Sequence, residues 1–226
     1  AMVSSSDFSS KGLDELVDRC ISMARVVPED EFCGLAPEDL LAEGSEDLDN
    51  FDPIEITENE LGARALEAED AALSIQGVTN SEGAEASWGR SLVALAASNG
   101  FASSRHGSSH SISVSVLAGE GTSMERDYDY TISVHSEDLM HPKDLGRSAG
   151  NKATSRLNPR KVATSKVPIV FDPRVSNSLL SHFSSAINGA SVARGTTFLK
   201  DKLGKKIFGD DITICDDPLR LRGLRS

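Results

Sequence analysis

The chain has 226 residues, of which 38% are hydrophobic and 26% charged, a composition typical of a soluble globular protein that can bury a core. No apolar run approaches the roughly 20 residues that a membrane-spanning helix needs, so we expect no membrane partner. The formal net charge of −12 argues against nucleic-acid binding by the chain as a whole, because affinity for phosphates requires a net basic face.

Charge is distributed unevenly along the chain. From His141 onward there are 16 Lys and Arg against 7 Asp and Glu, whereas the first 140 residues hold 7 basic and 28 acidic ones. The basic final third could bind phosphates as a local patch. We favour a solvated surface that faces an acidic neighbour.

The three cysteines, Cys20, Cys33 and Cys215, are scattered, and none belongs to a C-x-x-C pair. A sparse, odd-numbered set predicts reduced thiols in a cytosolic protein rather than a disulfide framework. Their spacing matches no zinc-ligand pattern. The sequence also begins without a charged and then apolar leader, so nothing in it argues for export.

The first predicted element is an amphipathic helix over residues 10–25. Serines precede it as candidate caps, and Asp14 and Glu15 occupy its first turn, where the helix dipole favours acids. Residues 26–63 contain no Lys or Arg and three prolines, so we expect an extended acidic connection. A second helix begins at Thr57, which forms a capping box with Glu60, and ends at Gly77.

The spacing of apolar residues then changes from a helical repeat to an alternation with a period of two residues. An apolar run over residues 92–97 ends at the turn dipeptide Asn99-Gly100. Alternation follows over residues 110–116 and again over 127–134, with a Gly-containing turn between them, which predicts an antiparallel meander with one buried face.

The second of these strands alternates acids with tyrosines. We expect the tyrosines on the buried face and the acids in solvent. The alternative is that Arg126, Tyr128 and Tyr130 belong to a strand that lines a peptide-binding cavity.

A third helix is predicted from Pro142 to Leu157, because proline is favoured in a first turn and Asn158-Pro159 stops the pattern. A strand over residues 167–171, a helix opened by Asp172-Pro173 and a last strand over residues 212–214 complete the order. This order predicts the α+β class, an antiparallel sheet packed with helices. We expect one domain over residues 1–158 and the beginning of a second, β-rich domain over 159–226, with the chain interrupted rather than finished.

No catalytic motif is visible in the sequence. His106 and His110 are four residues apart, but on a strand that separation is roughly 13 Å, too far for one zinc ion, and we expect ordinary polar surface. His135, His141 and His182 have no carboxylate or cysteine at ligand spacing, and no G-x-S-x-G elbow or phosphate-binding loop occurs.

Several phrases, in chain order, resemble the TldE/PmbA type of the TldD/PmbA family, also called "modulator of DNA gyrase" or peptidase U62. The first is Gly119-Glu120-Gly121 with Met124–Tyr130, the second is Ser155–Lys161 with Val167–Phe171, and the third is Ser191–Arg194 with Phe198–Gly204. The resemblance covers essentially the whole chain. It implies the middle portion of a cytoplasmic bacterial protein about twice as long.

The resemblance also implies a partner, TldD, which carries a His-Glu-x-x-x-His zinc motif on a helix that follows a strand. By placement, Asp172 and Asn177 fall where the histidines would be, and Pro173 where the glutamate would be. One carboxylate, one amide and one proline cannot make that zinc site. We therefore expect no metal or cofactor in this chain, zinc in the partner, and no peptidase activity of the chain alone.

The implied function is that of a non-catalytic subunit of a heterodimeric TldD/TldE zinc metallopeptidase. Its implied substrates are unfolded peptides such as microcin precursors and antitoxins. The alternative is a regulatory protein that binds DNA gyrase or another target without proteolysis.

Overall fold

The computed structural model describes residues 1–30, 33–42, 44 and 46–224 and has the α+β class that the sequence predicts. The helices are α1 (Ser10–Val26), α2 (Glu58–Leu73), α3 (Pro142–Ser155), α4 (Pro173–Ile187) and α5 (Gly189–Ala193). The strands are β1 (Val78–Ala96), β2 (Ala102–Ala118) and β3 (Glu125–Ser133), and short 3₁₀ turns are η1 (Glu38–Leu40), η2 (Gly121–Ser123) and η3 (Ser136–Asp138).

The chain divides into two compact units, and the first consists of residues 1–45 and 92–105. It contains α1 and the tip of the β1–β2 hairpin. Ser9 caps α1 by accepting a hydrogen bond from the Gly12 amide, as the serines before the helix predict. The Asn99 side chain, at the hairpin turn, donates to the Ala36 carbonyl at 2.9 Å.

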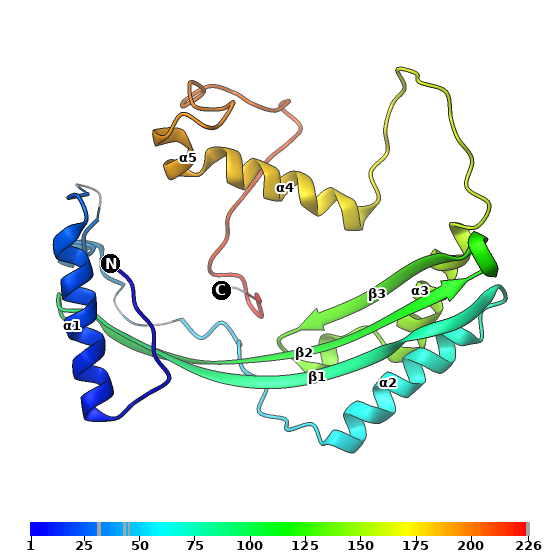
Figure 1. Ribbon diagram of the computed structural model, residues 1–226, viewed down its shortest axis with the longest axis horizontal. Coiled ribbons are helices and arrows are strands. Elements are labelled where there is room, and N and C mark those ends of the chain that lie inside the picture. Colours follow the sequence, from blue (N-terminus) through cyan, green and yellow to red (C-terminus); the bar gives the residue numbers. More distant parts are fainter. Residues whose placement is uncertain (31–32, 43, 45, 225–226) are drawn as a thin grey trace. The chain divides into compact units, whose positions relative to one another are not determined.

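The second unit, residues 46–91 and 106–226, holds the sheet and the helices α2 to α5. Its strands lie in the order β1-β2-β3 (Figure 1). The β2–β3 pair is antiparallel, with a register that runs from His110 opposite Ser133 to Ala118 opposite Glu125. Helices α2 and α3 cover one face of the sheet (Figure 1).

The core lies between this face and the two helices, and small side chains dominate it. The buried members are Ala68 and Ala72 of α2, Ile112, Val114, Val116 and Ala118 of β2, and Leu145, Ala149 and Ala153 of α3. Gly146 and Gly150 let α3 approach α2 closely, because a Cβ on Gly146 would lie 2.0 Å from the Ala68 carbonyl oxygen. The face of β2 that carries Ile112, Val114 and Val116 is therefore buried, and these three residues and Leu145 of α3 are the larger apolar side chains of the core.

Two predicted strands do not form. Residues 167–171 and 212–214 have no strand structure, although all of them except Pro168 are β-branched or aromatic. A strand needs a hydrogen-bonded neighbour, and β-propensity largely measures packing within a sheet. Neither segment pairs with a strand within the described part of the chain.

Helix limits agree with the sequence to within a few residues. The capping box of Thr57 and Glu60 starts α2, and Pro142 is the first residue of α3. The first part of β1, over residues 78–91, was not predicted, because glycine and charged residues interrupt its alternation. Within the described residues, each helix is too short or too polar to cross a lipid bilayer.

The close contact of α2 and α3 can be tested with Gly146→Ala. The new methyl group meets backbone that cannot move without shifting a helix, so we expect a loss of about 1–3 kcal/mol of unfolding free energy in urea denaturation. Gly62→Ala is the matched control, because nothing lies within 4 Å of a Cβ there. A helical Gly→Ala change in open space is expected to stabilise by about 0.5–1 kcal/mol. Equal effects of the two substitutions would contradict the packing described.

Candidate functional site

The two faces of β3 differ in chemistry and in exposure. Asp129 lies opposite Val114 and Asp127 opposite Val116, so both aspartates share the face that carries the core. They are 8% and 4% exposed. Tyr128 and Tyr130 point to the opposite face and are 42% and 49% exposed. The prediction that the tyrosines are buried and the acids solvated is therefore wrong.

Helix α3 explains the reversal for Asp129. Its carboxylate accepts hydrogen bonds from Ser148 Oγ at 2.5 Å and from Lys152 Nζ at 2.6 Å. Burial alone raises the pKa of Asp129, but these two partners and the Tyr130 amide lower it on balance, so the group is ionised and paired. A buried carboxylate is tolerated when hydrogen bonds and an opposite charge satisfy it. The alternation of residue types along a strand cannot reveal partners that a helix supplies.

Asp127 is satisfied by two arginines. Arg156, just after α3, donates from Nη1 at 2.9 Å, and Arg174, in the first turn of α4, donates from Nη1 at 2.8 Å. Burial alone raises the pKa of Asp127. Hydrogen bonds from Arg174, the Tyr128 amide and Arg156 outweigh it and lower the pKa from 3.8 to about 2.

The open face of the sheet has a shallow hollow of about 430 Å³. It is lined by Glu82, Gly83, Ala84 and Glu85 of β1, Ser113, Val114 and Ser115 of β2, and Arg126 and Tyr128 of β3. Glu82 forms an ion pair with Arg126 and accepts a hydrogen bond from Ser115 Oγ at 2.7 Å. The hydrogen bond from Ser115, together with Arg126, lowers the pKa of Glu82. Hydroxyl groups, one ion pair and an aromatic ring suit a polar, extended ligand such as a peptide.

The tyrosines of this face are stacked in a row with Arg174. The rings of Tyr128 and Tyr130 lie 6.4 Å apart with an interplanar angle of 20°. The Arg174 guanidinium carbon lies 4.9 Å from the centre of the Tyr128 ring, which is cation–π geometry. The structure thus places Tyr128 and Tyr130 side by side on the open face, and Arg126 beside Tyr128 in the hollow.

The three positions that the resemblance sets against the zinc motif lie at the start of α4. Asp172 is the N-cap and accepts a hydrogen bond from the Arg174 amide at 2.9 Å, and Pro173 is the first helical residue. The Asn177 carbonyl accepts from Ser181 Oγ at 3.3 Å. Within the described residues, no three His, Cys, Asp or Glu side chains gather in an arrangement suited to a metal ion. On their chemistry these positions fit zinc poorly, because the Asp172 carboxylate caps the helix and Pro173 has no side-chain ligand atom.

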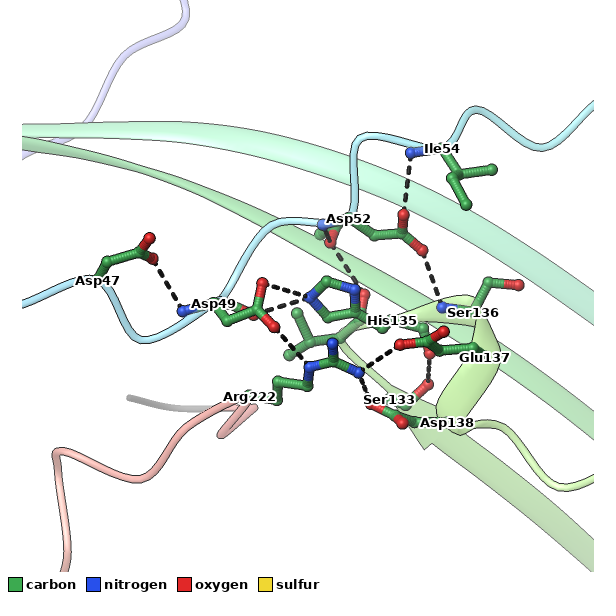
Figure 2. A network of polar contacts seen from close by, with 12 residues as sticks. Asp47, Asp49, Asp52, Ile54, Ser133, His135, Ser136, Glu137, Asp138 and Arg222 are labelled. Carbon is green, nitrogen blue, oxygen red and sulfur yellow. Dashed lines mark hydrogen bonds and ion pairs between the residues drawn. The ribbon is translucent and has the colours of Figure 1, made fainter.

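A polar network lies where β3 ends and the η3 turn begins (Figure 2). His135 Nε2 lies 2.9 Å from the Asp49 carbonyl oxygen and 3.1 Å from its Oδ1. Asp52 accepts hydrogen bonds from the Ser136 and Ile54 amides, both at 2.9 Å. Arg222 then reaches Asp49 from the C-terminal segment (Figure 2).

His110 is buried beside Asp52, a member of this network. Its Nε2 lies 3.2 Å from Asp52 Oδ2, yet neither ring nitrogen makes an aligned hydrogen bond. Burial is the largest cause that lowers the pKa of His110, although Asp52 opposes it. The expectation of polar surface is thus correct for His106, which is exposed against the Phe51 ring, and wrong for His110.

Sequence reasoning missed this network because its members are far apart in the chain. Asp49 and His135 are 86 residues apart, and Asp49 and Arg222 are 173 residues apart. The spacing Asp49-x-x-Asp52 lies in a stretch rich in acids and carries no signal of its own. The buried Ser108, which links the Asp52 amide to the Val134 carbonyl, lies in a serine-rich stretch and was equally inconspicuous.

Comparison with protein families gives two matches that together cover most of the chain. A model described as the PmbA/TldA metallopeptidase central domain matches residues 51–157. A model described as the PmbA/TldA metallopeptidase C-terminal domain matches residues 164–226.

Two curated relatives match over 99% of this chain. Metalloprotease PmbA of Escherichia coli O157:H7 is 38% identical, and the Metalloprotease PmbA homolog of Haemophilus influenzae is 35% identical. The chain spans about half the length of both relatives, 50% in each case.

Solved structures share the fold. A protein of Bacteroides thetaiotaomicron described as a candidate modulator of DNA gyrase is 27% identical, with a TM-score of 0.88 over 97% of this chain and 51% of its own. TldE from Thermococcus kodakarensis is 16% identical, with a TM-score of 0.61 over 88% of this chain and 45% of its own. At that identity the second likeness concerns the fold alone.

The pairing of Asp127 predicts acid sensitivity. Its pKa is lowered on folding, so its contribution is present above pH 3.8 and is lost as the pH falls through about 2. Asp127→Asn should lower the unfolding free energy at pH 5 by about 2 kcal/mol and by clearly less at pH 2. Urea titrations at both pH values measure this difference. The control is Asp18→Asn, on the exposed surface of α1, which should have little effect at either pH. An Asp127→Asn effect of the same size at pH 5 and pH 2 would refute the assignment.

Proposed function

The chain belongs to the PmbA/TldD family, and on that premise we propose that it is part of a non-catalytic, TldE-like subunit of a TldD/TldE zinc metallopeptidase. The TldD-like partner supplies the zinc, and this subunit helps to enclose the substrate. Substrates are unfolded peptides, such as microcin precursors and antitoxin proteins, and the complex works in the cytoplasm.

The start of α4 is the observation that carries this proposal. In the resemblance described above, the zinc motif lies on a helix that follows a strand, and this chain has capping chemistry at those positions. The carboxylate of Asp172 is engaged with a backbone amide, and Pro173 cannot act as a general base. Peptide hydrolysis by such a complex therefore depends on residues that another subunit supplies.

The open face of β3 supports the second part of the proposal. Tyr128 and Tyr130 offer aromatic surface, and Ser113 and Arg126 offer hydrogen-bonding groups in the adjoining hollow. Aromatic rings bury a large apolar area at a low cost in side-chain entropy, so they can bind peptides of many sequences. A folded domain presents few free backbone groups to such a face, whereas an extended chain presents many.

A second candidate function is regulation of DNA gyrase or another target by binding, without proteolysis. The observation that favours it is the description of the Bacteroides thetaiotaomicron relative as a candidate modulator of DNA gyrase. A stable complex with gyrase in the absence of any TldD-like protein would support this function over the first.

The peptidase proposal is tested by mixing the full-length version of this chain with the TldD-like protein of the same organism. Neither protein alone should cleave an unfolded peptide efficiently, whereas the mixture should cleave it, and a chelator should abolish the activity. Replacing the glutamate of the partner's zinc motif should abolish cleavage while the complex still forms, because the general base is lost.

Variants at the start of α4 form the matched control for that experiment. Asp172→Asn retains a good capping residue, and Asn177→Ala removes only an amide, so cleavage by the mixture should change less than twofold. A variant at either position that binds the partner normally but loses cleavage would overturn the proposal.

Metal analysis gives an independent check. After dialysis against zinc-free buffer, the purified chain should retain well under one zinc per chain, since its motif positions do not fit the ion. Elemental analysis that finds about one zinc per chain would contradict the assignment of the metal to the partner.

A further inference from the structure

Two arginines from the last third of the chain make contacts near β3, one close to its start and the other in the turn just after its end. Arg174 binds Asp127, the third residue of the strand. Arg222 binds Glu137 and Asp138, in the η3 turn just after the strand ends. The residues between these two arginines include α4 and α5.

The first contact is dense. Arg174 Nη1 donates to Asp127 Oδ1 and to the Tyr128 carbonyl oxygen, both at 2.8 Å, and Nη2 donates to Asp127 Oδ2 at 3.4 Å. Its side chain is only 26% exposed and lies against the Tyr128 ring. Because β3 is an edge strand, the bond to the Tyr128 carbonyl also occupies a free backbone acceptor at that edge.

In the second contact, the side chain and the backbone amide of Arg222 together bind four residues. Arg222 Nε donates to Asp49 Oδ2 at 2.6 Å, and Nη1 donates to Glu137 Oε1 at 2.7 Å and to Asp138 Oδ2 at 2.9 Å. Its amide donates to the Leu48 carbonyl at 2.8 Å. The side chain comes in from the C-terminal segment and points between Asp49 and the η3 turn (Figure 2). These carboxylates raise the pKa of Arg222, so the pairing is fully charged.

Apolar packing does little to hold the segment between them. Among the described residues after 158, only Ala186 and Thr197 are buried, and they contact each other through a 2.7 Å hydrogen bond. The apolar side chains of α4 remain largely exposed, with Val175, Leu179 and Leu180 each at 50%. The polar contacts of Arg174 and Arg222 therefore carry much of the attachment of this segment to the rest of the second unit.

We infer that Arg174 and Arg222 are positioning residues. They fix residues 174–222 near the start of β3 and at the η3 turn after its end, so that this segment borders the open face that carries Tyr128 and Tyr130. Tyr128, Tyr130 and Ile132 lie on the bordered stretch and are each exposed. At about 3.3 Å per residue, the strand from Asp127 to Ser133 offers room for about six residues of an extended polypeptide. The peptide as occupant rests on the proposed function, but the anchoring does not.

The anchoring is tested by hydrogen exchange on the full chain carrying Arg174→Ala, Arg222→Ala or both. Arg174→Ala should speed amide exchange over residues 173–187 at least tenfold and leave residues 219–224 nearly unchanged. Arg222→Ala should do the reverse. Residues 112–116 of β2 should exchange as in the wild type, which verifies folding. Arg160→Ala is the control, because it removes the same charge from the same part of the chain, and the exposed Arg160 forms no ion pair with any described residue.

Two further variants probe the geometry of the first anchor. Asp127→Asn weakens it from the other side and should also speed exchange over residues 173–187. Arg174→Lys retains the charge but lacks the planar fork, so it should give an intermediate rate. Unchanged exchange over residues 173–187 in Arg174→Ala, with β2 intact, would overturn the inference.

A binding measurement links the anchors to the face. A fluorescein-labelled, unstructured twelve-residue peptide of mixed sequence is titrated with each variant, and anisotropy gives the Kd. Either arginine variant should raise the Kd at least fivefold, whereas Arg160→Ala should not. Faster exchange with an unaltered Kd would overturn the bordering role. Peptide binding that is absent even in the wild type would instead count against the proposed function and leave the anchors in place.

Discussion

The arrangement of the second unit depends on how Asp127 and Asp129 are satisfied beneath α3. Both carboxylates are buried and ionised, and each requires a cation within hydrogen-bond reach. Lys152 meets that requirement for Asp129, and Arg156 and Arg174 meet it for Asp127. Because successive residues of a strand point to opposite faces, burying the two acids forces the tyrosines outward. The same pairings therefore create the open aromatic face.

Asp127 also connects parts of the chain that the sequence separates. It receives one arginine from the end of α3 and another from the start of α4, and the link between those helices has no regular structure. Removing a partner from a buried carboxylate leaves an uncompensated charge, which costs more than the pair contributes. We therefore expect the orientation of α4 to depend on whether the Asp127 carboxylate is ionised.

Local signals in the sequence located most helices and the two strands that flank the Gly119 turn. Capping residues such as Thr57 and Pro142 act within a few positions of themselves, and the alternation of β2 identified its buried face correctly. The face of β3 could not be predicted, because acids and tyrosines alternate with the same period and the decision rests with Lys152 and two arginines. Residues 167–171 were misassigned for a related reason, since strand structure requires a neighbouring strand. The network of Asp49, His135 and Arg222 depends on contacts across more than 80 residues, which spacing within a motif cannot encode.

The contact between α2 and α3 has a mechanical consequence. Ala68 and Ala72 meet Gly146, Ala149 and Gly150, and none of these side chains has a rotamer that could change. Because these five residues have no side chain that can change rotamer, this part of the contact absorbs little displacement, and we expect the two helices to move together. Any shift of α3 that disturbs Lys152 would carry α2 with it, including Arg64, whose guanidinium donates to Ser136 Oγ at 2.9 Å. This arrangement predicts coupling between the aspartate end of β3 and the η3 turn after its other end.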